Sequence, residues 1–105
     1  MATLDDILAE FTGALVERYG ERLDRLVCCG SVARGEAGPE SDVDLALVLK
    51  GEVRPSGEID LLVDLLAEFN LRYGVLISLL PVGRETWEKA PGPFWRNVRR
   101  QGRDL

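Results

Sequence analysis

Three short apolar runs, set between stretches with helical spacing, limit what this chain can fold into. The runs span residues 26–29, 43–49 and 75–80, and each has the length of a buried strand. Helices are predicted for residues 4–19, 31–36 and 56–73 and from about Pro93, with one further helical turn over residues 85–90. The order α-β-α-β-α-β-α predicts a single α/β (α+β) domain over residues 1–105, with a small mixed three-stranded sheet flanked by helices.

The ends of these predicted elements carry capping and breaking residues. Thr3, followed three residues later by Asp6, is typical of a capping box, and Gly20 is placed to end that helix. Ser56 is the predicted cap of the next long helix, and Pro81 is expected to close the third strand. The apolar stripes predicted to be buried are Leu4, Ile7, Leu8, Phe11, Leu15, Val16 and Tyr19 in the first helix, and Ile59, Leu62, Val63, Leu66 and Phe69 in the second.

Composition narrows the classes of function. The 105 residues carry a net charge of −5, which argues against direct binding of nucleic acid. No histidine is present, so Ser-His-Asp, Cys-His and histidine-metal sites are excluded within this sequence. The charge is uneven, because residues 84–105 hold six basic and three acidic side chains. This tail is either a solvated helix face or a face for a partner or a nucleotide.

Cysteine usage and hydropathy bear on the compartment. Cys28 and Cys29 are adjacent in an apolar run, a pattern that matches neither a disulfide framework nor a zinc site. We interpret them as buried strand residues in a reducing cytosol. No stretch has the length and apolarity of a membrane span, and Asp5, Asp6 and Glu10 interrupt any signal-peptide pattern. We therefore expect a cytoplasmic protein that makes no contact with a membrane.

The chemistry-bearing part of the sequence begins with Gly30-Ser31, where a predicted strand passes into a predicted helix. Glycine allows close approach of the backbone to a phosphate, and the first turn of a helix presents free amides. Ser31 adds a hydroxyl donor. Many turns of this kind bind nothing, and a Walker loop is excluded because its lysine is missing.

Asp42 and Asp44 form the second half of this constellation. They stand two residues apart at the start of a predicted strand, so alternation places both carboxylates on one side of the sheet. Two like charges at this spacing favour a divalent cation between them, and oxygen ligands suit magnesium. A capping role at the strand edge is the structural alternative. Together, the two halves predict a site for a magnesium-bound nucleoside triphosphate.

The residues Gly30-Ser31, Ala33-Arg34-Gly35, Ser41-Asp42 and Asp44-Leu45 resemble the signature of the minimal nucleotidyltransferases of the DNA polymerase β-like superfamily. The resemblance covers essentially the whole chain. It implies that Gly30 and Ser31 contact the triphosphate of ATP or another nucleotide, with Arg34 and Ser41 in the same binding set. It also implies that Asp42 and Asp44 bind Mg²⁺ and carry catalysis. The tail over residues 90–102 is similar to that of an MntA-like antitoxin branch, whose members are paired with helical HEPN proteins and in several cases transfer AMP to a toxin tyrosine.

One position departs from the family pattern, which places a third carboxylate on the third strand. Alignment on Tyr73-Gly74 puts Leu76 there, and a shift of two residues, which keeps the same face, puts Ser78 there. Neither side chain is a carboxylate. The acidic residues of the preceding helix would have to reach into the site: Glu58, Asp60, Asp64 and Glu68.

Three functions follow as alternatives. The first is a Mg²⁺-dependent transferase that moves AMP from ATP to a protein partner, expected to be a HEPN-type helical protein. The second is a degenerate module that neutralises such a partner by contact, with Trp87, Phe94 and Trp95 either anchoring the interface or covering the sheet. The third, a nucleic-acid polymerase or tRNA-type transferase, would need a second subunit. Open sheet edges also lead us to expect a homodimer or heteromer.

Overall fold

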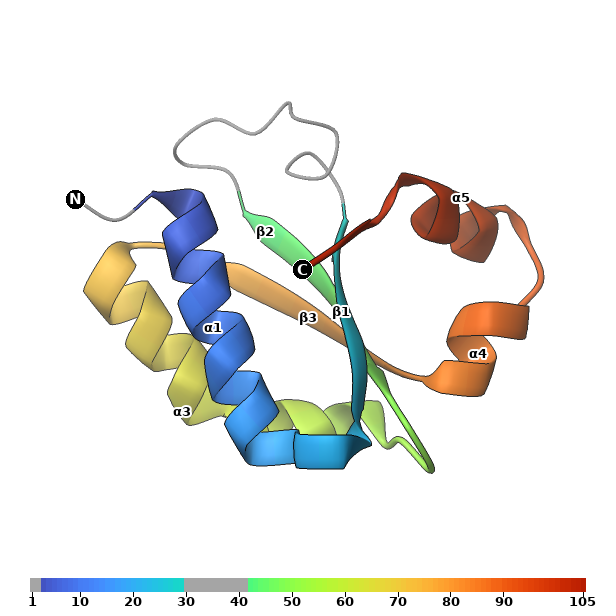
Figure 1. Ribbon diagram of the computed structural model, residues 1–105, viewed down its shortest axis with the longest axis horizontal. Coiled ribbons are helices and arrows are strands. Elements are labelled where there is room, and N and C mark those ends of the chain that lie inside the picture. The colour runs from blue at the N-terminus through green and yellow to red at the C-terminus, as the bar shows by residue number, and fades with distance from the viewer. Residues whose placement is uncertain (1–2, 30–41) are drawn as a thin grey trace.

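A four-stranded sheet separates two layers of helices in the computed structural model, which describes residues 3–29 and 42–105 (Figure 1). On one side lie α1 (Leu4–Tyr19) and α3 (Pro55–Tyr73), and on the other lie α4 (Arg84–Lys89) and α5 (Pro93–Gln101). A short 3-10 turn, η1 (Gly20–Arg22), leads from α1 into the sheet. The expected α/β class is confirmed, while the helix predicted over residues 31–36 lies outside the described residues.

The sheet has the strand order β3-β2-β1-β4. Its strands are β1 (Leu23–Cys29), β2 (Val43–Leu49), β3 (Ile77–Gly83) and β4 (Arg103–Asp104). Strand β2 runs antiparallel to β1 and parallel to β3, so the expected mixed sheet is confirmed. The expected number of strands is wrong, because β4 pairs with Val27 and Cys28 and Leu105 N donates to Leu26 O at 2.9 Å. A strand of two residues is too short to give a period in the sequence.

The helix ends follow local chemistry. Thr3 and Asp6 form the predicted capping box, and α1 ends at Gly20. Gly74 ends α3 in the left-handed region at φ 67°, a conformation that glycine adopts without a steric penalty. The predicted cap Ser56 is wrong: the N-cap is Arg54, two residues earlier, because Pro55 fits the first turn, where its missing N–H costs no hydrogen bond.

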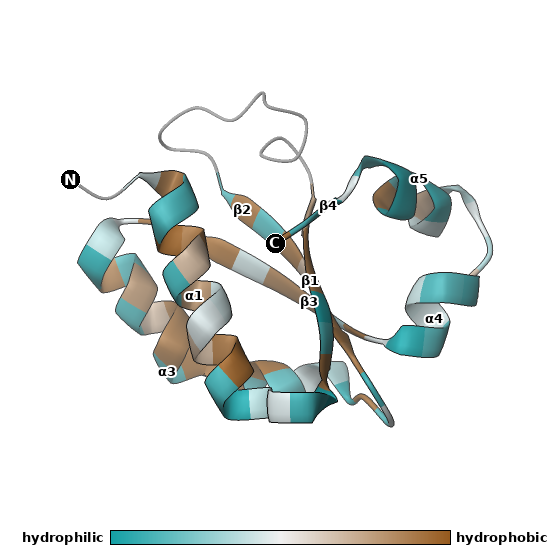
Figure 2. Ribbon diagram, viewed as in Figure 1, coloured by the Kyte–Doolittle hydropathy of each residue, from teal (hydrophilic) through white to brown (hydrophobic). Residues whose placement is uncertain are grey.

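The two faces of the sheet support two cores. Val43, Leu45, Leu47 and Leu49 of β2 pack toward α1 and α3, whereas Ala46 and Val48 pack with Trp87 of α4. Alternation along a strand produces this division, and Figure 2 shows apolar residues recurring along α1, α3 and the strands.

Two residues of the apolar stripes that were predicted to be buried are not buried. Val16 and Val63 are about half exposed, at 52% and 53%. In α3 the buried line passes through Leu62, Leu65 and Phe69, and Val63 lies outside it.

Strand β3 runs further along the chain than expected. It was predicted to end before Pro81, but Pro81 and Val82 both lie within it and are buried. The carbonyl of Leu76 accepts from Val43 N at 2.9 Å, so alternate backbone groups from Leu76 onward face β2. Pro81 belongs to the outward-facing set, where a strand at the edge of a sheet tolerates a missing N–H.

Candidate functional site

A row of three polar side chains crosses the sheet on the face toward α5. In the register of the sheet, Asp44 of β2 is the partner of Cys29 on β1 and of Ser78 on β3. Register partners project from the same face, so a thiol, a carboxylate and a hydroxyl stand side by side. Asp44 and Ser78 are exposed and Cys29 is half-buried.

This row lies on the floor of a cavity of about 400 Å³. The strands contribute Cys29, Asp44 and Ser78, and α5 contributes Phe94, Val98 and Gln101 as a wall. The spacing i, i+4, i+7 brings these three residues of α5 onto one side of the helix. The volume lies within the usual range of roughly 300–1,000 Å³ for small-molecule pockets. The floor therefore carries one carboxylate, Asp44, beside Leu45, Leu79 and Leu80, and the wall is largely apolar.

Two contacts fix the position of α5 as that wall. Arg99 donates to Trp87 O at 2.8 Å and to Ala90 O at 3.0 Å, which ties α5 to the end of α4. Beyond the helix, Gly102 lies so close to β1 that an added Cβ would come within 2.4 Å of Val27 Cγ1. A glycine is therefore required where the chain passes from α5 into β4.

The predicted site residues fall into two groups. Asp44 lies on the cavity floor, and Asp42 is exposed immediately before β2, two residues from Asp44. The predicted nucleotide-binding residues Gly30, Ser31, Arg34 and Ser41 lie outside the described residues. The described neighbours of that segment are Cys29 and Asp42. Cys29 belongs to the row that holds Asp44, and Asp42 lies two residues before Asp44.

The register distinguishes the two positions, Leu76 and Ser78, that the sequence offered for a third carboxylate. Ser78, not Leu76, is the partner of Asp44 on β3, and it shares the cavity floor. Leu76 precedes β3 and is exposed. Among residues 3–29 and 42–105, no three or more carboxylate, thiol or imidazole side chains gather in a way that would hold a metal. The described site therefore provides two carboxylates and one hydroxyl.

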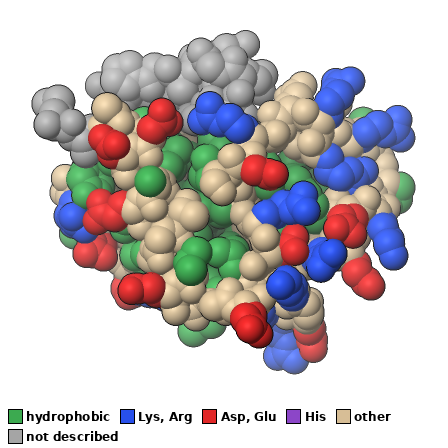
Figure 3. Space-filling view, in the orientation of Figure 1, with side chains coloured by type: hydrophobic (Ala, Val, Ile, Leu, Met, Phe, Trp, Pro, Cys, Tyr) green, Lys and Arg blue, Asp and Glu red, His purple; other side chains and the backbone are tan. Residues whose placement is uncertain are grey.

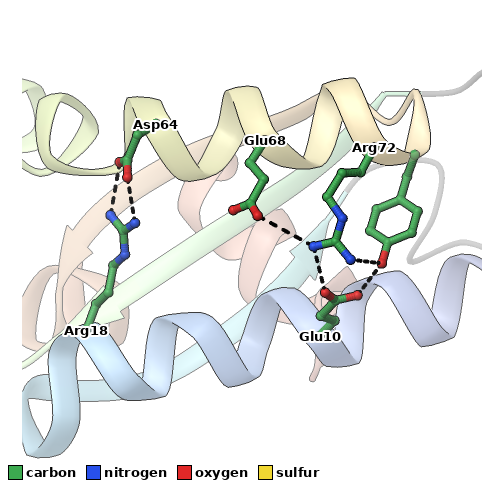
Figure 4. Close-up of polar contacts among 6 residues, drawn as sticks. Glu10, Arg18, Asp64, Glu68 and Arg72 are labelled. Carbon is green, nitrogen blue, oxygen red and sulfur yellow. Dashed lines mark hydrogen bonds and ion pairs between the residues drawn. The ribbon is translucent and has the colours of Figure 1, made fainter.

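The acidic residues of α3 do not complete this set, because α3 covers the opposite face of the sheet. Glu58 is buried and accepts from Tyr19 Oη at 2.8 Å and from Arg22 at 2.9 Å. Asp64 pairs with Arg18 at 2.8 Å, as Figure 4 shows.

Glu68 is held on the same side of the molecule. It contacts Arg72 at 3.6 Å, and Arg72 also pairs with Glu10 of α1 at 3.0 Å (Figure 4). Asp60 is exposed on the same helix. The ion pairs Arg72–Glu10 and Asp64–Arg18 join α3 to α1, and all these carboxylates belong to helices on the sheet face opposite Asp44.

The thiol beside Asp44 is held in its neutral form. Burial raises the pKa of Cys29 and is the largest effect. A hydrogen bond with the Ala46 backbone lowers this pKa, and the nearby Cys28 and Asp44 raise it. The Cys29 thiol donates to Val27 O at 3.6 Å. A protonated thiol is a poor nucleophile and a poor magnesium ligand, so Cys29 lines the cavity floor without a role in catalysis or metal binding.

The remaining donors fit magnesium. Asp42 and Asp44 supply carboxylate oxygens at the spacing of alternate strand positions, and Ser78 supplies a hydroxyl oxygen across the ladder. Hard oxygen donors on an open floor leave room for the phosphates and waters that complete magnesium coordination. This donor set would hold a metal-bound phosphate group at the Asp44 end of the cavity.

The cavity wall formed by α5 was not predicted from the sequence. Trp87 is buried and Trp95 packs against the same core, so these two residues cover the sheet, which was one of the two alternatives for them. Phe94 instead lines the cavity and is 59% exposed. Phe94, Trp95 and Val98 form a short apolar stripe on α5, but their spacing does not say which face of the sheet the helix covers or that a cavity lies beside it. Figure 3 shows basic side chains gathered on the α4 and α5 side, in agreement with the charge of the tail.

No helix in the described part of the chain has the length and hydropathy needed to cross a bilayer.

Comparison with known proteins agrees with this geometry. A family model described as "Nucleotidyltransferase domain" matches residues 8–97. "Putative protein adenylyltransferase MJ0604" of Methanocaldococcus jannaschii is 35% identical over 99 residues, which cover 93% of each chain. A protein of the same organism with the same descriptive name, MJ0141, is 33% identical over 73 residues, which cover 70% of this chain and 73% of that protein.

One solved structure supports the fold. A crystal structure described as that of a putative nucleotidyltransferase from Sulfolobus solfataricus aligns with a TM-score of 0.58, over 78% of this chain and 68% of that chain. The sequences are 18% identical, so the likeness concerns the arrangement of helices and strands. The two chains therefore share a fold over the aligned part.

Proposed function

This chain belongs to the nucleotidyltransferase domain family, and from that premise we propose that it is a Mg²⁺-dependent adenylyltransferase that transfers AMP from ATP to a protein. The observation that carries the proposal is the position of Asp44 on the cavity floor, two residues from Asp42. The names of the relatives, protein adenylyltransferases, support AMP as the group transferred and protein as the acceptor.

The chain's own residues have defined tasks in this reaction. Asp42 and Asp44 would hold the metal, with the α5 wall limiting access of water from one side. A bound magnesium ion would neutralise charge on the phosphates and orient the leaving group. An acceptor hydroxyl then forms a bond to the α-phosphorus, the bond to the β-phosphate bridging oxygen breaks, and pyrophosphate leaves. The proton of the hydroxyl must go to a carboxylate at the site or to water.

The hydroxyl of Ser78, in place of a carboxylate, lowers the expected rate of this reaction. A hydroxyl at this position neither ligates a second metal strongly nor removes a proton at neutral pH. Asp44 is therefore the one described carboxylate that the cavity floor offers for both tasks. We expect slow transfer, limited by deprotonation of the acceptor.

We propose a HEPN-type helical protein as the acceptor. The similarity of the tail over residues 90–102 to that of the antitoxin branch supports it. The side that carries α4 and α5 presents exposed basic residues, including Arg96 and Arg100, which would suit an acidic partner surface. Placement in the cytoplasm follows from this proposal, because both proteins of such a pair act inside the cell.

The second candidate function is neutralisation of that partner by contact. Ser78 in place of a carboxylate is the observation that favours it, since a site with two carboxylates can bind a nucleotide without turning it over. The two functions differ in whether the partner ends up covalently modified.

The test is transfer of label from ATP carrying radioactive α-phosphate, with magnesium and the co-purified partner. Wild type should label the partner, and Asp44→Asn should lower the rate at least about 100-fold. Asp60→Asn, an exposed change of the same chemistry on α3, is the matched control and should leave the rate unchanged. Equal labelling by wild type and Asp44→Asn would contradict the proposal. A partner that is bound and neutralised by Asp44→Asn without any label would favour neutralisation by contact.

A further inference from the structure

The wall that α5 contributes to the cavity has a chemistry of its own. Phe94, Val98 and Gln101 lie one helical turn apart on the side of α5 that faces the cavity floor. Two of them are apolar and the third ends in an amide. None carries a charge, so this surface is suited to a flat, neutral, partly polar group and not to phosphates.

Phe94 is the most unusual member of this wall. It is 59% exposed, whereas Trp87 of α4 is buried and Trp95 packs against the core. Its ring contacts Trp95 edge to face at 5.2 Å and 80°, a geometry that supports the ring from one side. An aromatic ring that is held by a neighbour, lines a cavity and keeps most of its surface exposed offers a platform for another ring.

Gln101 supplies the other element of recognition. Its side-chain amide is exposed at the same cavity and has both a donor NH₂ group and an acceptor oxygen. A glutamine amide can pair with the amino and ring nitrogens on one edge of adenine, as glutamine does when proteins read that base in DNA. A guanine presents an oxygen in place of the amino group, so the same amide orientation does not serve both bases.

We propose that the α5 wall is the nucleobase subsite of this cavity, with Phe94 stacking on the base and Gln101 bonding to the edge of adenine. The inference rests on the proposed function, because it assumes that the triphosphate lies at the Asp44 end. It goes further by assigning two residues that bind the base, of which Gln101 selects adenine. Arg99 and Gly102 fix α5 against α4 and β1, so the platform is formed before the nucleotide arrives.

The subsite and the phosphate site can be separated with two ligands. Calorimetry in the presence of magnesium measures the binding of each ligand. ATP reports on the whole site, and inorganic triphosphate reports on its phosphate end alone. Phe94→Ala should weaken ATP binding about 10- to 100-fold, the range for loss of one base–aromatic stack, and leave triphosphate binding unchanged. Phe94→Tyr should restore ATP binding. Leu71→Ala, which truncates a residue that is 85% exposed on α3, is the matched control and should change neither.

Gln101 is tested by base preference. Wild type should bind ATP more tightly than GTP, and Gln101→Leu should reduce that preference about 10-fold or more while triphosphate binding stays the same. Circular dichroism of each variant confirms the fold.

The outcomes distinguish this inference from the function beneath it. Wild type that binds ATP no better than inorganic triphosphate has no base subsite, and this result overturns the inference while the transferase proposal stands. Phe94→Ala that loses both ligands equally, with its fold intact, would also overturn it. Failure of wild type to bind either ligand would overturn both.

Discussion

Asp44 on β2 and Ser78 on β3 are register partners in the parallel part of the sheet, and both line the floor of one cavity. A hydroxyl thus lies next to the carboxylate that we propose as a metal ligand. The nearest alternative in the sequence, Leu76, precedes the strand. The pairing is specific enough to predict the effect of placing a carboxylate at either position.

Ser78→Asp should therefore increase AMP transfer. A carboxylate beside Asp44 would add a metal ligand and a proton acceptor, and general-base catalysis is worth about 100-fold or more. Leu76→Asp adds the same charge two residues earlier and should give no increase. Initial rates with labelled ATP check both variants. An increase with Leu76→Asp alone would mean that the register of β2 and β3 is not the one described.

Gly102→Ala and Gly13→Ala should change stability in opposite directions. A Cβ at Gly102 would come within 2.4 Å of Val27 Cγ1 and 2.8 Å of Val98 O, so β4 and the end of α5 must shift. A Cβ at Gly13, within α1, meets nothing within 4 Å, and glycine to alanine in a helix gains about 0.5–1 kcal/mol. Urea unfolding measures both changes, and protease sensitivity reports release of α5. A Gly102→Ala protein as stable as wild type would contradict the close packing of this turn.

Glu58→Ala should destabilise the fold far more than Asp64→Ala. Glu58 is 6% exposed and accepts from both Tyr19 and Arg22, so its removal leaves the Tyr19 hydroxyl without its acceptor and Arg22 without its ion pair, with Glu52 O still accepting from Arg22. Loss of such a group costs about 2 kcal/mol or more. Asp64 is paired with Arg18 on the surface, where water replaces the ion pair, and its removal should have a small effect. The shift in the urea midpoint at constant slope compares the two, and equal shifts would contradict the difference in burial.

High pH should unfold the protein partly through Tyr19. Burial, followed by the hydrogen bond to Glu58, raises the pKa of Tyr19 to about 12. A raised pKa means that the folded state favours the protonated phenol. Its contribution to stability is complete below the ordinary pKa of about 10 and is lost as the pH rises from there toward 12.

Tyr19→Phe provides the comparison. This variant should be less stable than wild type at neutral pH, and the difference should shrink above about pH 10, because only wild type has this phenol to ionise. Unfolding curves at several alkaline pH values measure the difference. The ultraviolet titration of the tyrosines should also lose its step near pH 12 in the variant. A constant stability difference across this range would contradict the assignment.

The parts of the fold that depend on residues close together in the chain could be predicted from the sequence. The capping box at Thr3 and Asp6, the end of α3 at Gly74 and the seven residues of β2 all appear as expected. Each depends on residues a few positions apart. The family signature around Asp44 gave the class of chemistry for the same reason.

What the sequence left open depends on contacts between distant segments. The choice between Leu76 and Ser78 required the pairing of β3 with β2, which no local pattern contains. Strand β4 forms because the chain beyond Gly102 meets β1, more than seventy residues earlier in the sequence. The wall of the cavity is likewise a property of where α5 docks. The sequence alone does not distinguish Phe94 from other exposed aromatic residues, because its place at the cavity depends on the position of the sheet.

Pro81 has a consequence for how this protein behaves at high concentration. Strand β3 forms one edge of the sheet, and its outward-facing backbone groups would be a template for a strand from another molecule. Proline in that outward set removes one of the donors that such a strand would need, and its ring obstructs close approach. The residue that extends β3 beyond its predicted end thereby also protects the domain from edge-to-edge aggregation.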